Sequence, residues 1–308
     1  MRARVAVLLA GLVLCFPVHS RCAAQAWPPP RGELSASTTF QRVVASGHFM
    51  DDGSKLAGYR TRATNLLLNL SYGITDRLAV SMDLPFVNVK YLGPEEPFNL
   101  PDNTLDDGAY HGTLSDIKVA ISGQAFDYPL AVTPFFAASI PSHAYPTLGE
   151  AAAGRGLQEY EVGVYGGRVL DPFLSSAFVQ GVFSYTFVRQ NIDIPLNYSN
   201  VELSAGYVVA QTLQVSVFWR RQFAHGGLTF DSLFVAPPSV FRNFDRVVAQ
   251  SFQHVGVAAT YPVSESMSAH ANFVKFVSGV DAHYGYGFSA GLSWTLQTFS
   301  EPGPFDRK

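Results

Sequence analysis

The chain has 308 residues, of which 47% are hydrophobic and 15% charged, and its formal charge is −3 at pH 7. That length allows two soluble domains or one large β-barrel. Five residues are lysine, and no cluster of basic residues could follow a phosphate backbone. The composition therefore argues against nucleic acid as a partner.

The first 26 residues have the pattern of a secretory signal peptide. Two arginines precede an apolar run at residues 5–18, and an A-x-A motif ends at Ala26. The run is shorter than the about 20 residues that a membrane helix needs, so we predict a cleaved signal peptide at 1–26 rather than an uncleaved anchor. Cleavage removes both cysteines and leaves 18 basic and 24 acidic residues, a formal charge of −6. The secreted chain must therefore be stable without disulfide bonds.

The clearest β-hairpin lies at residues 61–90. In its first half apolar residues such as Leu66 alternate with polar residues such as Asn65. After a turn the alternation resumes, with Phe86 on the apolar side and Asp83 on the polar side. Each run is about twice the usual 5–6 residues of a strand. The sequence predicts two long antiparallel strands with one apolar and one polar face.

The same alternation continues to the end of the chain after a proline-rich lead-in at 27–32. We predict twelve strands, at residues 33–46, 61–72, 77–90, 113–126, 129–140, 157–169, 173–188, 197–209, 212–223, 247–261, 266–278 and 285–299. Short turns alternate with loops that are expected to be long, at 47–60, 91–112, 141–156, 189–196, 224–246 and 279–284.

Short turns at one rim and long loops at the other are typical of a bacterial outer-membrane barrel. The strand lengths suit a tilted membrane crossing, which takes about 9–11 residues, and aromatic residues gather beside the turns and loops as interfacial girdles require. A soluble β-sandwich also alternates, but the Gly, Ser and Ala residues of the polar parity suit a crowded lumen better. We predict an all-β fold, a single antiparallel up-and-down transmembrane β-barrel at 33–299, with both termini periplasmic and a periplasmic tail at 300–308.

The last predicted strand also carries an assembly signal. The pattern of Ser289, Gly291, Trp294 and Leu296 resembles the C-terminal signal by which the assembly machinery recognises outer-membrane barrels. We therefore expect the barrel assembly machinery as a partner, although further residues follow Phe299.

If the apolar residues of each strand face lipid, the polar residues that alternate with them face the lumen. Charges of both signs can pair across a small lumen, where they either rigidify the interior or guide a solute. Twelve strands enclose more space than eight, whose side chains can fill the interior, and less than a porin of 16 to 18 strands. Any pathway would therefore admit small solutes. The predicted lumen residues and transport candidates are Arg77, Asp83, Asp116, Lys118, Glu159, Glu161, Glu202, Arg220 and His254.

Two basic residues interrupt the apolar face. Lys275 shares the parity of Phe273, so either a β-bulge near Phe273 reverses the faces or Lys275 extends along the wall to the outer rim. Arg221 also lies on the lipid parity, where it is solvated or meets anionic headgroups. Outer-membrane lipid and lipopolysaccharide are thus expected partners.

The histidines do not predict an enzyme. After the signal peptide, His254 and His270 fall on adjacent predicted strands, without a Gly-x-Ser-x-Gly motif. Loop histidines near Asp51-Asp52 and Asp106-Asp107 match no known ligand spacing, so we predict no metal and no cofactor. The histidines of the predicted outer loops are His48, His111, His143, His225 and His283.

Three segments carry a family resemblance: YGITDRLAVSMDLPFV at 72–87, GTLSDIKVAISGQ at 112–124 and LQEYEVGVYGG at 157–167. In these the chain resembles the outer-membrane barrel family named for the MetA pathway of phenol degradation, whose members are described as transporters. It departs from the family at 112–116, where members commonly have Gly-Leu-Gly-Asp. The resemblance implies an outer-membrane location and uptake of small aromatic or hydrophobic compounds.

The sequence thus favours a channel or transporter for uptake of small solutes. One alternative is a closed structural or surface-interaction barrel that acts through its outer loops. A second alternative is an outer-membrane hydrolase, for which loss of activity in His254→Ala would be diagnostic.

Overall fold

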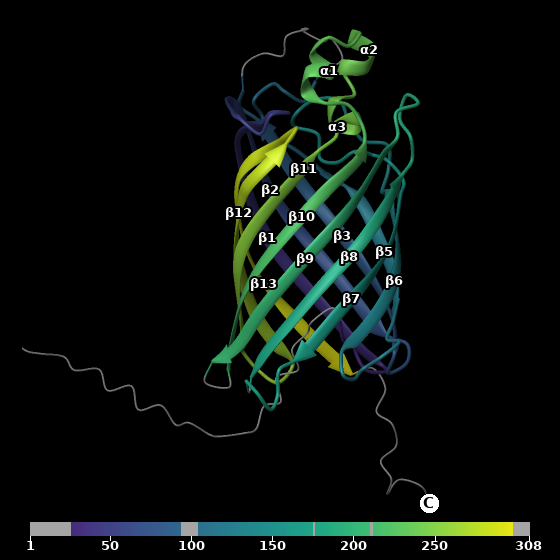
Figure 1. Ribbon diagram of the computed structural model, residues 1–308, viewed down its shortest axis with the longest axis vertical. Coiled ribbons are helices and arrows are strands. Elements are labelled where there is room, and N and C mark those ends of the chain that lie inside the picture. Colours follow the sequence, from purple (N-terminus) through teal and green to yellow (C-terminus); the bar gives the residue numbers. More distant parts are fainter. Residues whose placement is uncertain (1–25, 94–103, 175, 210–211, 298–308) are drawn as a thin grey trace, which may run out of the picture.

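The computed structural model describes residues 26–93, 104–174, 176–209 and 212–297 (Figure 1). The predicted signal peptide at 1–26, apart from Ala26, and the predicted tail at 300–308 lie outside the described residues. The strands are β1 (Glu33–Phe49), β2 (Lys55–Gly73), β3 (Leu78–Tyr91), β4 (His111–Leu114), β5 (Asp116–Gly123), β6 (Ala131–Pro141), β7 (Glu159–Val169), β8 (Ala177–Val188), β9 (Leu196–Val209), β10 (Leu213–Gly226), β11 (Ser251–Pro262), β12 (Met267–Val280) and β13 (Ala282–Gln297).

The strands form one closed antiparallel wall. The sheet closes into a barrel because the first strand, β1, pairs with the last strand, β13, as well as with β2. β4 and β5 both pair with β3 and together make one strand of the wall. The break between them lies beside Pro85 of β3, which has no backbone N–H to donate, and leaves Ser115 outside the ladder. The structure is therefore a barrel of twelve strands, and the predicted fold class is confirmed.

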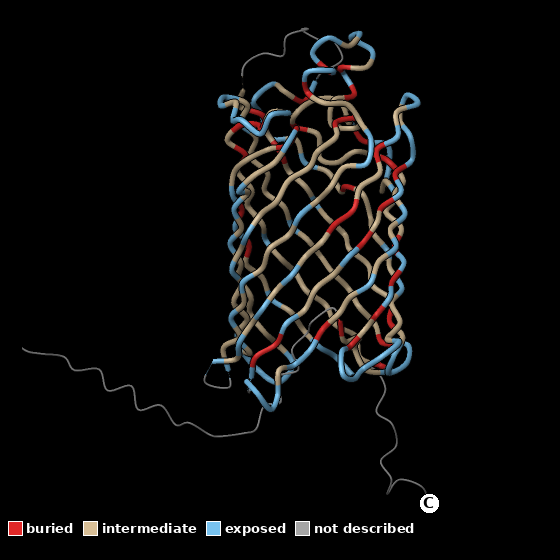
Figure 2. Tube along the Cα trace, in the orientation of Figure 1, coloured by how far each residue is buried: buried red, intermediate tan, exposed pale blue. Residues whose placement is uncertain are grey.

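Apolar side chains cover the outside of this wall. On β13, Phe288 is 47% exposed and Leu292 39%, whereas the intervening Ser289 is 2% exposed. Leu66 and Phe86 show the same outward placement on β2 and β3. In Figure 2 most of the wall is intermediate or exposed, and buried residues lie in the folded loops, near the lower rim and along a few strands such as β6 and β8. An outer surface of this kind suits lipid rather than water.

The strand ends that flank the five turns predicted to be short lie at one end of the barrel, here called the turn end, and the strand ends that flank the other connections lie at the loop end (Figure 1). Two connections expected to be long are short hairpins, because their strands continue beyond the predicted limits. They are residues 50–54 and Asp281, whose φ is 50°. The connection predicted at 189–196 is found at residues 189–195. Long connections remain at residues 92–110, 142–158 and 227–250.

The connection 227–250, predicted as a loop, contains three short helices. These are α1 (Phe230–Phe234), α2 (Pro238–Phe241) and α3 (Phe244–Val247). Their apolar side chains form a small core with Met50 and Ile194 of the neighbouring hairpins, and Asp281 accepts the N–H of Phe230 at 2.8 Å. We call residues 227–250 the helical cap. Among the described residues, no helix is long and apolar enough to cross a membrane.

β12 contains a β-bulge, which bears on the predicted facing of Lys275. The register of β11 and β12 shifts between Gln253 and His254, which leaves Val277 without a partner. The bulge lies beyond Lys275, which stays opposite the outward-facing Tyr286. A reversal of faces at Phe273 is therefore wrong, and Lys275 lies on the outer face.

Candidate channel lumen

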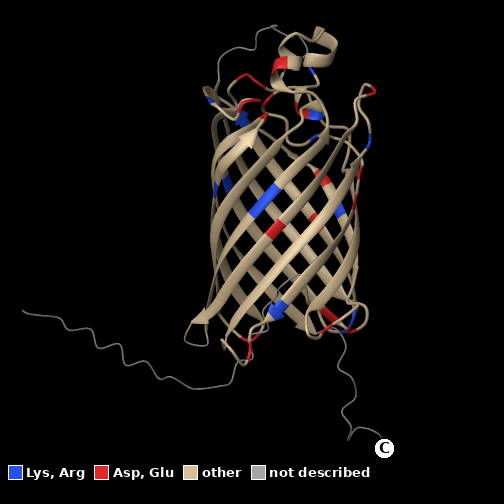
Figure 3. Ribbon diagram, in the orientation of Figure 1, with Lys and Arg blue, Asp and Glu red and all other residues tan. Residues whose placement is uncertain are grey.

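The inner face of β3, β5 and β7 carries a cluster of charged side chains. The ammonium of Lys118 donates to the carboxylate of Glu161 over 2.6 Å, and these side chains are 36% and 16% exposed. Asp83, the register partner of Lys118, accepts a hydrogen bond from the Asn69 amide at 2.5 Å. Ion pairing and hydrogen bonding lower the cost of placing these charges in the interior. Figure 3 shows charges of both signs part-way along the wall and again at the lower rim, with few charges between them in this view.

The connection 142–158, which we call the crossing loop, is bound to the wall through two further acidic residues. Arg155 donates to Glu159 at 2.5 Å, and the Tyr198 hydroxyl donates to the same carboxylate at 2.7 Å. The hydroxyl of Tyr145 donates to Asp116 at 2.5 Å. Burial and the neighbouring carboxylate raise the pKa of Tyr145, so the hydroxyl keeps its proton and remains a donor. Both acids therefore hold the crossing loop in place.

The opposite side of the lumen combines a guanidinium group with aromatic rings. Glu202, Arg220 and His254 are successive register partners across β9, β10 and β11. The centroid of the His254 ring lies 6.2 Å from that of Phe218 and 5.3 Å from that of Phe276. Within the described part of the chain, the buried Nδ1 of His254 has no hydrogen-bond partner. This side of the lumen therefore places aromatic rings beside charged and polar groups.

Arg77 does not belong with the other predicted lumen residues. It lies in the turn between β2 and β3, where its guanidinium is 3.8 Å from Asp127 of the next turn, and its side chain is 64% exposed. The predicted strand at 77–90 begins one residue later, at Leu78. The expectation for Arg77 is therefore wrong, because a turn residue is free to point away from the lumen. The other predicted residues lie on inward faces of strands: Asp83, Asp116, Lys118, Glu159, Glu161, Glu202, Arg220 and His254.

At the turn end, residues 26–31 lie inside the mouth of the barrel. The Thr133 hydroxyl of β6 donates to the carbonyl of Ala26 at 2.7 Å. A Cβ at Gly167 of β7 would come within 2.7 Å of the Trp27 indole, and one at Gly73 of β2 would collide with the carbonyl oxygen of Pro30. These residues, which we call the strap, therefore run from β6 and β7 to β2. The sequence identified a lead-in at 27–32 but not its position within the lumen.

At the loop end, the crossing loop reaches from β6 and β7 to distant strands. Ala151 is 1% exposed and packs against Val89 and Tyr91 of β3 and Tyr59 of β2. The Ser115 hydroxyl donates to the carbonyl of Ala153 at 2.9 Å. The crossing loop therefore narrows the upper mouth, beneath the helical cap. The sequence carries one signal for this packing, the run of three alanines at 151–153, which is unusual for a solvated loop.

His270, the second histidine predicted to lie on a strand, has two hydroxyl neighbours. His270 Nε2 lies 2.9 Å from the Thr39 hydroxyl, and its Nδ1 lies 3.4 Å from that of Ser293. A catalytic triad needs a carboxylate or amide on the imidazole nitrogen that does not face the serine. Here a threonine hydroxyl occupies that place. The arrangement links three strands by hydrogen bonds and does not support a hydrolase.

No protein-family model matches the sequence, and no curated protein matches it. Solved barrels match its structure. An outer membrane channel from Pseudomonas putida F1 gives a TM-score of 0.68 at 11% identity, with 88% of this chain and 98% of that chain covered. The translocator domain of the autotransporter NalP from Neisseria meningitidis gives 0.51 at 11% identity, with 86% and 89% covered. The NanC porin gives 0.50 at 10% identity, with 85% and 100% covered. At these identities the likeness shows a shared outer-membrane-type barrel fold.

Proposed function

We propose that the chain is an outer-membrane channel for small solutes. The observation that carries this proposal is the two-sided lumen, with paired charges on β3, β5 and β7 facing a guanidinium and aromatic rings on β9 to β12. Paired charges can rigidify a closed interior as well as guide a solute, so the proposal depends on the second side, where the buried Nδ1 of His254 has no hydrogen-bond partner among the described residues. The likeness to an outer membrane channel supports the same conclusion.

We further propose that the solutes are small and aromatic. Phe218 and Phe276 flank His254, and Arg220 lies beside it in register. Aromatic rings attract one another and attract cations, and a guanidinium binds carboxylate groups. A small aromatic acid or phenol would satisfy both kinds of group. The strap and the crossing loop restrict the pathway to molecules of that size.

The test is single-channel conductance of the purified barrel in a planar bilayer, with benzoate or phenol added afterwards. We expect discrete current steps that either solute interrupts. Silence from a barrel shown to be folded would overturn the channel proposal. The closed interaction barrel would then be favoured, since segments of the chain cross both mouths.

Neutralising Lys118 should change the ion selectivity of this channel. In Lys118→Gln the carboxylates of Glu161 and Asp83 lose their cationic neighbour, so the lumen should come to prefer cations. Unit charges about 4 Å apart in water interact by about 1 kcal/mol, so we expect the permeability ratio of K⁺ to Cl⁻ to rise about fivefold. Reversal potentials measured across a salt gradient give this ratio.

Lys275→Gln is the matched control, because it removes the same charge from the outer face of the wall. Its permeability ratio should equal that of the unmodified barrel. Equal ratios in the Lys118 and Lys275 variants would contradict the assignment of Lys118 to the conducting path.

We propose that the loop end faces the cell exterior, with the termini periplasmic. Lys275, Tyr286, Val44, Arg62 and Lys90 follow one another in register around β12, β13, β1, β2 and β3, on the outer face. On β13 the stretch from Tyr286 to Leu296 has the length of a tilted crossing, about 9–11 residues. The basic residues Lys275, Arg62 and Lys90, which we call the basic row, therefore lie at the upper border of the apolar belt. Phosphorylated glycolipid of the outer leaflet fits that position.

The basic row should bind lipopolysaccharide through its phosphates. Arg62 and Lys90 are directly opposite one another, where like charges repel unless an anion lies between them. A cation near an anionic membrane surface contributes about 1 kcal/mol, so the double change Arg62→Gln with Lys90→Gln should weaken lipid A binding at least about tenfold. Native mass spectrometry of the detergent-purified barrel measures this.

Lys118→Gln is the control for the lipid experiment, since it removes a cation from the inner face. It should bind lipid A as the unmodified barrel does. The proposed orientation would lose this support if lipid A bound equally well to the Arg62 and Lys90 double variant. The same holds if removal of its phosphates left lipid A binding unchanged.

A further inference from the structure

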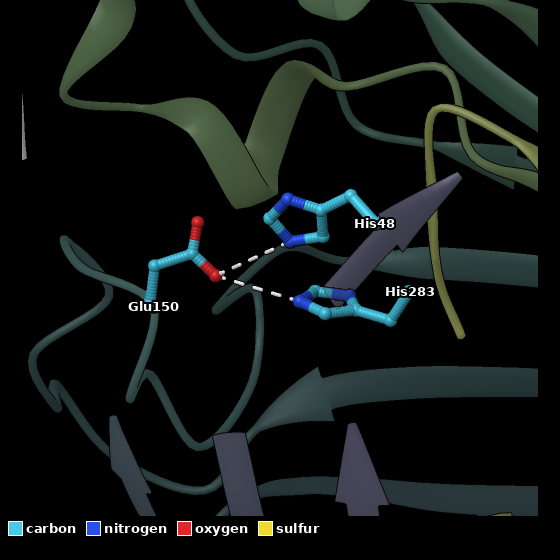
Figure 4. A group of neighbouring side chains, drawn as sticks. All are labelled: His48, Glu150 and His283. Atoms are coloured by element: carbon cyan, nitrogen blue, oxygen red, sulfur yellow. Dashed lines mark hydrogen bonds and ion pairs between the residues drawn. The ribbon is translucent and has the colours of Figure 1, made fainter. Parts of the chain in front are cut away.

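Three side chains with metal-binding atoms meet at the loop end, below the helical cap (Figure 4). His48 near the end of β1 and His283 near the start of β13 are register partners. Glu150 reaches them from the crossing loop. Its Oε2 is 3.8 Å from the Nε2 of His48 and 3.4 Å from the Nε2 of His283, and the three ligand atoms all lie within 4.8 Å of one another.

These distances are close to those of a coordinated ion. Zinc binds imidazole nitrogen and carboxylate oxygen at about 2.0–2.2 Å, which places neighbouring ligands of a tetrahedral site about 3.3 Å apart. The 3.4 Å between Glu150 Oε2 and His283 Nε2 is already close to this value. The 3.8 Å between Glu150 Oε2 and His48 Nε2 would shorten to it after a small movement of the side chains. Two histidines and one carboxylate leave one position for water. The side chain of His283 is 27% exposed, which gives an ion access from the mouth.

The state of His48 points to a ligand. The residue is 4% exposed, yet its Nε2, which faces Glu150, is buried without a hydrogen-bond partner among the described residues. Its ring is held by Tyr59, whose centroid is 5.3 Å away, and by Phe230 at 5.0 Å. A buried ring nitrogen without a partner costs free energy. A metal ion at the centre of the cluster would remove that cost.

The position of Glu150 is fixed by a residue of the neighbouring connection 92–110. The two carboxylate oxygens of Asp106 accept the backbone N–H groups of Glu150 and Ala151, at 3.0 and 2.9 Å. Ala151 in turn packs in the core beside β3. Supporting hydrogen bonds of this kind hold a metal ligand in its orientation. The crossing loop thus presents Glu150 to the two histidines of the wall.

We propose that His48, Glu150 and His283 bind one divalent transition-metal ion, of which Zn²⁺ is the representative. Borderline ions of this class take imidazole and carboxylate ligands together, whereas Ca²⁺ and Mg²⁺ prefer oxygen ligands alone. Two ligands belong to the wall and one to the crossing loop, so the ion ties the loop to β1 and β13. The prediction of no metal from sequence considered acidic pairs near the histidines; the cluster instead uses Glu150, which is distant in sequence from both.

The test is calorimetric titration of the full barrel, folded in detergent, purified without a histidine tag and stripped with EDTA. We expect one Zn²⁺ per chain and no saturable binding of Ca²⁺ or Mg²⁺. Glu150→Gln and His283→Ala should each weaken Zn²⁺ binding by at least about 10–100-fold, the loss typical of altered metal-site residues. Hydrogen exchange of peptides from 142–158 should slow when Zn²⁺ is added to the unmodified chain.

His111→Ala is the matched control. His111 also lies at the loop end and contacts a carboxylate, Asp107, at 2.8 Å, but it is outside the cluster. This variant should keep the stoichiometry and affinity of the unmodified barrel. The proposal would be overturned if the folded barrel bound no Zn²⁺. It would also be overturned if the Glu150 and His283 variants bound Zn²⁺ as tightly as the unmodified barrel. The measurement needs no solute flux, so it can fail or succeed independently of the channel proposal.

Discussion

A mature chain that begins at Gly32 is expected to form a channel of several-fold higher conductance than one that begins at Trp27. The strap crosses the mouth at the turn end, with Trp27 against Gly167 and Pro30 against Gly73. Besides the bond from Thr133 to Ala26, the strap is held at Arg31, whose N–H donates to Asp76 at 3.1 Å and whose carbonyl accepts the Gln297 amide at 3.1 Å. Removing these residues frees space without touching a strand. Both chains can be refolded in detergent and compared in the same bilayer.

The Gly32 chain must first be shown to fold, by its mobility on a gel with and without heating. If it is folded and its conductance equals that of the Trp27 chain, the strap does not limit flow. The narrowest point would then lie at the crossing loop. If the conductance of the Gly32 chain rises as expected, that chain should also discriminate less between small and larger solutes, because conductance and size selection depend on the same constriction.

Leu292→Arg is expected to lower the free energy of unfolding by about 2–4 kcal/mol, the cost of a cation on the lipid face near the middle of the membrane. Leu292 is 39% exposed on the outside of β13, and its register partners are Thr38 of β1 and Ala269 of β12. A guanidinium at this position must leave the hydrocarbon or draw water into it. Denaturant titration of the barrel in lipid vesicles measures the difference.

Ser293→Arg provides the control, because the next residue of the same strand faces the lumen. Its hydroxyl lies 3.4 Å from Nδ1 of His270, a contact whose loss is small beside the cost of a charge in lipid. This variant should retain most of its stability and alter ion conductance instead. Equal unfolding free energies for the two variants would mean that the faces of β13 are assigned wrongly.

The alternation of apolar and polar residues was sufficient to predict the wall. In a β-strand successive side chains point to opposite faces, so the period of two along β13, from Tyr286 to Leu296, already separates the lipid side from the lumen side. The same pattern identified Lys118, Glu161 and Arg220 as inward-facing. It failed where backbone geometry changes within a strand. The register shift that leaves Val277 unpaired, and the extended hairpin at 50–54, depend on pairing with neighbouring strands.

The sequence by itself determined the barrel, its strand order and the polarity of its two faces, because these follow from local periodicity and the lengths of connections. Tertiary structure alone decided what occupies the ends. The strap meets Gly167, Glu150 meets His48 and His283, and α1 meets Asp281 through contacts between residues far apart in the chain. Such contacts have no local period, since they arise when closure of the wall brings distant segments to one mouth.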